Sequence, residues 1–120
     1  MTEDDIRDLF ASFGPVTIRR MFGGKGIYAD GRIFALYLHD QLRLKADGEN
    51  SPELAAAGST QWIYQSRHGK PVAMPYWSAP DTALDDPDEM AAWARKSFEA
   101  ALRTETATAA KKAAKPPKRA

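Results

Sequence analysis

Residues 16–46 alternate between apolar and polar side chains, and residues suited to tight turns break this alternation three times. The apolar members that recur at every second position are Val16, Ile18, Leu42, Leu44 and Ala46. A period of two is typical of a half-buried β-strand. The breaks fall at residues 23–26 (GGKG), 30–31 (DG) and 39–40 (HD), and an Asp-Gly pair readily takes the positive φ angles of a two-residue hairpin turn. The stretch therefore predicts a meander of about four antiparallel strands, the last of which turns Arg43 and Lys45 outward.

Helical spacing of apolar residues replaces this alternation on both sides of the stretch. Thr2 is suited to cap the first helix, and Gly14 and Pro15 are suited to end it. The predicted helices lie between Thr2 and Gly14, between Ser51 and Gly58, and from Asp86 to about Thr104.

Two further strand candidates, residues 61–66 and 72–77, lie between the second and third predicted helices. Pro71 and Pro75 cannot donate to a strand ladder, so the second candidate is expected to be an edge strand or to be irregular. The fold class is therefore α+β: an antiparallel meander sheet of about five to six strands with an N-terminal helix, a short middle helix and a long C-terminal helix packed on the sheet.

Charge divides the chain into two parts. Residues 1–104 have a net charge of −3, and residues 105–120 have a net charge of +4 with no aromatic or large aliphatic side chain. Such a segment buries too little apolar surface to fold, so we expect a domain at 1–104 and a disordered basic tail at 105–120. The tail can contact DNA weakly and without sequence preference, or serve only as a solubilising end. Its basic residues are Lys111, Lys112, Lys115, Lys118 and Arg119.

Several function classes have no support in the composition. The chain lacks cysteine, which excludes disulfides and thiolate metal sites, and His39 and His68 stand in no metal-ligand spacing. No serine lies in a Gly-x-Ser-x-Gly elbow. The longest apolar run, residues 33–38, is far too short to span a bilayer, and the acidic first residues do not resemble a signal peptide. We therefore expect a cytoplasmic protein without membrane contact, catalytic residues, metal or cofactor.

A basic stretch in the middle of the chain is the main candidate for binding. Residues 19–70 have a net charge of +3. If their cations converge on one face of the sheet, that face could bind nucleic acid or an acidic protein. Aromatic side chains such as Trp62, Tyr64 and Tyr76 could add a stacking surface. Solvated outward positions and ordinary packing explain the same residues without a partner. The cations in question are Arg19 or Arg20, Arg43, Lys45, Arg67 and Lys70.

The glycine-rich break admits two interpretations. Successive backbone N–H groups at Gly23 and Gly24, next to Lys25, could form an anion-binding nest. A Walker A loop is excluded because the chain continues as a strand instead of a helix. We favour a structural turn between two strands. The alternative is a small-ligand or anion site in a cleft lined by this turn, Arg20, Lys45 and Lys70.

Two blocks of residues resemble the N-terminal domain of the TfoX/Sxy family. The first block comprises Arg19, Arg20, Met21, Phe22, Gly23 and Gly24, then residues 26–28 (GIY), 30–31 (DG) and 34–36 (FAL). The second comprises residues 70–77 (KPVAMPYW), 84–86 (LDD) and 93–94 (WA).

The resemblance implies an α+β domain found in bacterial regulators of competence and transcription, usually followed by a helical C-terminal domain. Only residues 105–120 follow here, so a stand-alone N-terminal domain is expected. We predict a non-enzymatic regulatory or protein-interaction domain with a protein partner of unknown identity, and a homodimer stays open. The candidate binding residues are Arg19, Arg20, Met21, Phe22, Gly23, Gly24, Lys45, Lys70 and Tyr76.

Overall fold

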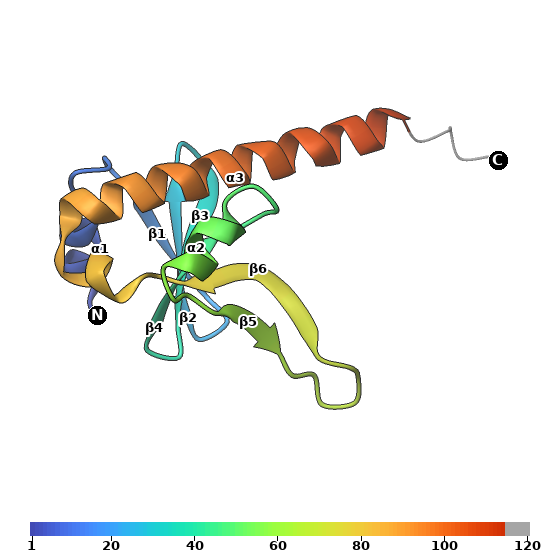
Figure 1. Ribbon diagram of the computed structural model, residues 1–120, viewed down its shortest axis with the longest axis horizontal. Helices are drawn as coiled ribbons and strands as arrows, with labels where there is room; N and C mark the ends of the chain where they lie inside the picture. Colours follow the sequence, from blue (N-terminus) through green and yellow to red (C-terminus); the bar gives the residue numbers. More distant parts are fainter. Residues whose placement is uncertain (115–120) are drawn as a thin grey trace.

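The structure is a computed structural model that describes residues 1–114. Within these residues six strands form one antiparallel sheet in the order β1-β2-β3-β4-β6-β5, accompanied by three α-helices and a short 3-10 helix, η1 (Figure 1). This arrangement confirms the predicted α+β fold. The strands are β1 (Thr17–Met21), β2 (Gly24–Ala29), β3 (Arg32–Leu38), β4 (Gln41–Lys45), β5 (Gln61–Tyr64) and β6 (Val72–Ser78). The helices are α1 (Glu3–Leu9), α2 (Ser51–Ala56), η1 (Asp81–Asp85) and α3 (Pro87–Ala114).

Three two-residue turns join the first four strands. Each turn has positive φ at both of its central residues, which is the geometry that matches the twist of a hairpin. The predicted turns at 30–31 and 39–40 are confirmed. The break predicted at residues 23–26 is instead a two-residue turn at Phe22-Gly23, and residues 24–26 already belong to β2. The turn pairs are Phe22-Gly23, Asp30-Gly31 and His39-Asp40.

The last two strands leave the simple meander. β6 inserts between β4 and β5, with Lys45 paired to Tyr76 and Ala46 donating to the Pro75 carbonyl at 3.0 Å. Of the two alternatives for the proline-containing strand, the irregular one holds, because the pairing of β5 with β6 shifts register between Gln61 and Ile63. The strand order places β5, and not β6, at this edge of the sheet.

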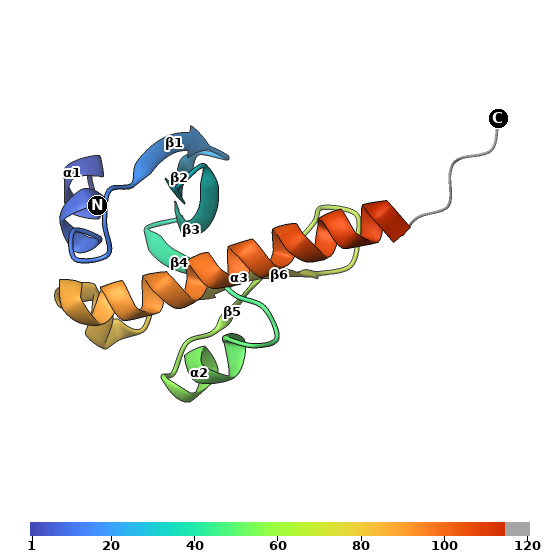
Figure 2. The ribbon, with the colours of Figure 1, turned by 90° about the horizontal axis from the view of Figure 1, so that it is seen from above.

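The core lies between the sheet and the helices α1 and α3. α3 crosses one face of the sheet (Figure 1), and in the view from above α1 and α2 lie on opposite sides of α3 (Figure 2). Phe34 is fully buried, with ring centroids 5.3 Å from Phe10 and 5.1 Å from Phe13. The apolar stripe of α3, which includes Met90 and Ala94, completes this core. The predicted cap of α1 is confirmed, since Thr2 and Asp5 bond each other's backbone N–H groups.

α3 continues to Ala114, ten residues beyond the domain boundary predicted at Thr104. Arg32 of β3 donates to Glu105 at 2.5 Å, and alanine, which is frequent after residue 105, has the highest helix propensity. The ion pair and the alanine content favour a helix here, whereas the lack of large apolar side chains led to the prediction of disorder. Residues 115–120 of the predicted tail lie outside the described residues.

No helix within residues 1–114 is long and apolar enough to cross a membrane.

Candidate functional site

The face of the sheet that points away from α3 collects cations. Cα partners in an antiparallel ladder share a face, so the register places Arg19, Leu36 and Arg43 in one row across it. Ile27 and Leu44 lie in the next row, on the face that packs against α3. We call the surface away from α3 the open face.

Each cation of the open face lies over an aromatic ring. The Arg19 guanidinium is 5.1 Å from the centroid of Tyr28, the Arg43 guanidinium is 4.9 Å from Trp62, and the Lys45 ammonium is 5.3 Å from Tyr76. Within residues 1–114, none of the three cations has a carboxylate within ion-pair distance. The rings therefore hold three unpaired positive charges along one surface.

Arg43 and Lys45 lie on the face away from the core as predicted, but Arg43 is buried and Lys45 is half-buried instead of fully solvated. Arg43 is 8% exposed and donates to the Leu38 carbonyl at 2.8 Å, and burial lowers the pKa of Arg43 and of the half-buried Lys45. The reason is tertiary: the β5–β6 hairpin brings Trp62 over Arg43. Burial and the nearby Tyr28 raise the pKa of Tyr76 to about 12, so its hydroxyl stays neutral.

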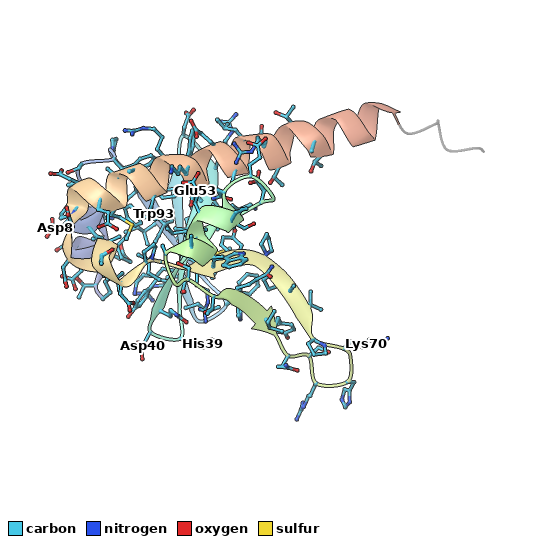
Figure 3. The ribbon with its side chains drawn as sticks, in the orientation of Figure 1. Asp8, His39, Asp40, Glu53, Lys70 and Trp93 are labelled. Carbon is cyan, nitrogen blue, oxygen red and sulfur yellow. The ribbon has the colours of Figure 1, made fainter. Side chains whose placement is uncertain are left out.

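An open groove of about 690 Å³ lies between the β1–β2 and β3–β4 turns and the β5–β6 hairpin, and two of its lining residues, Leu38 and Trp62, contact Arg43. Its walls are mainly apolar. Figure 3 shows His39 at the β3–β4 turn and Lys70 near the tip of the hairpin, both on the side away from α3. Its lining residues are Phe22, Leu38, His39, Trp62, Ile63, Tyr64, Gln65 and Met74.

Phe22 is the most unusual residue of the groove. Its ring is 81% exposed, and its backbone has φ 51° in the first position of the turn, where Asn or Gly is usual. The left-handed region is unfavourable by about 1–2 kcal/mol for an L-residue with a side chain. Ile63 and Tyr64 are also exposed, at 44% and 50%. This rim of large apolar side chains is poorly explained by folding alone.

The glycine turn has a structural explanation. A Cβ at Gly24 would lie 2.4 Å from the Tyr37 carbonyl oxygen, and a Cβ at Gly26 would lie 2.6 Å from Met21 Sδ. The first contact is with backbone, so the packing of β2 against β3 requires glycine at position 24, whereas the Met21 side chain could move away from a Cβ at position 26.

The predicted binding residues do not converge on one site in the structure. Arg19, Met21, Lys45 and Tyr76 lie on the open face, and Phe22 lies at the groove. Arg20 and Lys25 are partners on the other side of β1 and β2, and they line a separate cavity of about 340 Å³ with Gly23 and Gly24. Lys45 and Lys70 are not part of that cavity. Arg67 and Lys70 lie in the β5–β6 loop.

The basic residues of the predicted tail are only partly covered by the structure. Lys111 and Lys112 fall in the last turns of α3, and Lys115, Lys118 and Arg119 lie outside the described residues.

Five groove residues were not singled out from the sequence for binding: Leu38, His39, Ile63, Gln65 and Met74. Their pattern is that of ordinary strand and turn residues, so periodicity alone does not distinguish them. A usable signal is the dipeptide Phe22-Gly23, because phenylalanine in a two-residue hairpin turn contradicts turn preferences. Within residues 1–114 no group of three or more His, Asp or Glu side chains is placed to hold a metal ion.

The family model of the TfoX N-terminal domain matches residues 8–101 of the chain. The match therefore covers all six strands and more than half of the long helix. None of the curated proteins matches the chain.

Proposed function

Because the chain belongs to the TfoX N-terminal domain family, we propose that it is a non-enzymatic protein-interaction domain of a regulator, and that its partner docks in the groove of the open face. The observation that carries this proposal is the groove itself, which is lined by the exposed Phe22 of the β1–β2 turn and by exposed residues of β5. We extend the proposal to competence and transcription regulation, which the family resemblance implies.

The energetics of the groove support a docking role. An exposed ring such as that of Phe22 buries little area, so it adds little to folding, while its left-handed backbone is unfavourable. Anchors of protein interfaces are typically aromatic side chains that become buried only in the complex. Phe22 has the properties of such an anchor.

Site-directed photocrosslinking tests this function. A photoreactive phenylalanine analogue at position 63 should form an adduct with one protein in cells, and the same analogue at the exposed α3 position of Arg95 should not. The captured protein is then purified and its affinity is measured. We expect Phe22→Ser to weaken binding about tenfold or more, as for the loss of a central anchor. A captured protein that binds Phe22→Ser and the unchanged chain equally well would contradict docking in the groove, as would the absence of any adduct.

A weak DNA contact through the tail is a separate part of the proposal, supported by its composition. A chain that ends at Ala110 lacks all five basic tail residues and keeps Glu105, the partner of Arg32. We expect the full chain to bind duplex DNA at low salt, with a log–log salt slope no steeper than about −4.5 for five contacts. The shortened chain should have a smaller slope. Equal affinities of the two chains would remove this part of the proposal.

Anion binding at the glycine turn is a second candidate function, favoured by the cavity that Arg20 and Lys25 line. Titration of the protein with inorganic phosphate should shift the backbone NMR signals of Gly23 and Gly24, and Arg20→Gln should reduce the shift. Arg67→Gln, a change of the same kind in the distant β5–β6 loop, is the control. Signals that do not move up to millimolar phosphate would exclude this function.

A further inference from the structure

We propose that the groove takes an acidic, extended segment of a partner protein, which pairs with the free edge of β5 and inserts apolar side chains between Phe22 and the β5–β6 hairpin. This inference rests on the proposed function and specifies the partner's chemistry. Three features of the open face support it: an unprotected edge strand, a surface of unpaired cations, and apolar groove walls.

The two edge strands of the sheet differ in how they resist pairing. β1 (TIRRM) presents two arginines, and charged side chains are a common means of protecting an edge. β5 (QWIY) contains neither charge nor proline. Within the described residues it pairs only with β6, so its second edge has no strand partner. An extended peptide can add to such an edge through main-chain hydrogen bonds.

The groove runs along this edge. Four consecutive residues, Trp62 to Gln65, line it, although successive residues of a strand point to opposite faces. A depression confined to one face would be lined by alternate residues. The lining pattern therefore indicates that the groove reaches the backbone of β5, where a paired segment would lie.

Charge favours an acidic segment. None of the six strands contains Asp or Glu, whereas Arg19 and the half-buried Lys45 are unpaired on the open face, and Arg67 and Lys70 lie in the neighbouring loop. By contrast, Asp30, Asp47, Glu49 and Glu53 are already paired with other cations of the described chain. Carboxylates of a bound segment would complement the unpaired cations.

Two other occupants fit less well. A second copy joined through this face would bring like charges together, because each copy presents the same cations. Nucleic acid needs free aromatic faces for stacking, but Tyr28, Trp62 and Tyr76 already carry cations over their rings. The aliphatic walls formed by Leu38, Ile63 and Met74 suit apolar side chains better than phosphates.

The inference is tested with synthetic peptides of about ten residues, whose affinity for the protein is measured by fluorescence anisotropy. The first probe alternates Glu with Val and Phe; the second has Lys for Glu, and the third has Ser for Val and Phe. A single-stranded oligonucleotide of mixed sequence is the fourth probe. We expect the first probe to bind about tenfold or more tightly than each of the others.

Matched variants separate the contribution of charge from that of main-chain pairing with the edge of β5. Arg19→Glu should weaken the first probe about tenfold, and Arg95→Glu on the exposed side of α3 should leave it within about twofold. N-methylation of alternate residues of the probe removes hydrogen-bond donors from one of its edges. We expect one methylation pattern to abolish binding and the complementary pattern to preserve it, because one edge alone faces β5.

Four results would overturn the inference. They are stronger binding of the basic peptide or the oligonucleotide, equal effects of the two methylation patterns, no binding of any probe, and a dimer of this chain that Ile63→Ser dissociates. The crosslinking experiment separates this inference from the proposed function. A captured partner whose affinity does not change in Arg19→Glu would leave groove docking intact and overturn the acidic segment, whereas the absence of a partner would remove the function itself.

Discussion

The two faces of the sheet come from the same strands but follow different rules. The face under α3 is apolar and closed: Ile27, Ala35 and Leu44 are nearly or fully buried against α1 and α3. The open face holds Arg19, Arg43 and Lys45, each over an aromatic ring and none with a carboxylate partner in the described residues. Both faces are partly shielded from water, but only the face under α3 buries apolar side chains, for which burial is favourable.

The difference shows where the fold gets its stability and where it tolerates unfavourable groups. Burying a guanidinium without a carboxylate is unfavourable for folding. An exposed phenylalanine with a left-handed backbone makes a further unfavourable contribution. The apolar core on the α3 side offsets these terms. The open face is thereby free to keep residues that suit a ligand better than they suit folding.

The largest effect is expected on the closed face. Phe34→Ala removes a fully buried ring that contacts Phe10 and Phe13, and should lower the free energy of unfolding by about 3–5 kcal/mol. Urea denaturation followed by circular dichroism measures this. If Phe34→Ala is less destabilising than Tyr64→Ala on the open rim, the assignment of the two faces is wrong.

A smaller loss is expected for the buried cation of the open face. Arg43→Ala removes the donor to the Leu38 carbonyl and the contact with Trp62, and should destabilise the fold by about 1–3 kcal/mol. Arg43→Met fills similar space without a charge and should lose less. The same denaturation assay compares the two variants. Equal losses would mean that the cation itself, rather than its volume, stabilises the open face.

The pH dependence of the unfolding free energy should come from an ion pair between α3 and the β4–α2 loop. Arg103 of α3 donates to both carboxylate oxygens of Asp47 at 2.6 and 3.0 Å, which lowers the pKa of Asp47 to about 2. Since an unfolded Asp has a pKa of about 3.9, this contribution is complete above pH about 4 and is lost as the pH falls through about 2. With solvent screening we expect on the order of 1 kcal/mol.

Asp47→Asn provides the control for this pH dependence. Its unfolding free energy should be lower near neutral pH and should lack this part of the acid transition. The groove should be unaffected, so binding of the acidic probe should not change. An unchanged acid transition in Asp47→Asn would show that other carboxylates dominate it.

The smallest expected effect has the opposite sign. Phe22→Asn creates an Asn-Gly pair, which suits the positive φ angles of the β1–β2 turn, and should stabilise the fold by about 0.5–1 kcal/mol. The same change should weaken partner docking. Thermal denaturation and the crosslinking assay measure the two effects. A destabilised Phe22→Asn would mean that the exposed ring contributes to folding after all.

Features that depend on neighbouring residues were predicted well. The hairpin turns at 30–31 and 39–40, the Thr2 cap and the apolar stripe of α3 follow from local backbone preferences and periodicity. Features that depend on distant residues were not. Neither the place of β6 beside β4 nor the ion pair between Arg32 of β3 and Glu105 of α3 follows from a local pattern.

The candidate site shows the same division. Arg19, Phe22, Lys45 and Tyr76 were identified from the sequence, but the groove that joins Phe22 to Ile63 was not. Periodicity assigned Arg43 to a solvated face because alternation distinguishes two faces and does not show what covers them. The β5–β6 hairpin provides the cover.

By itself, the sequence determined the family, the α+β class and the local elements, because hairpin turns, helix caps and residue periods act over a few neighbouring positions. Only the tertiary structure decided that Trp62 lies over Arg43 and that an apolar groove opens beside them. That outcome depends on pairing β6 with β4, strands separated by a helix and a further strand. Such long-range pairing is set by the packing of the whole chain, which a local pattern does not contain.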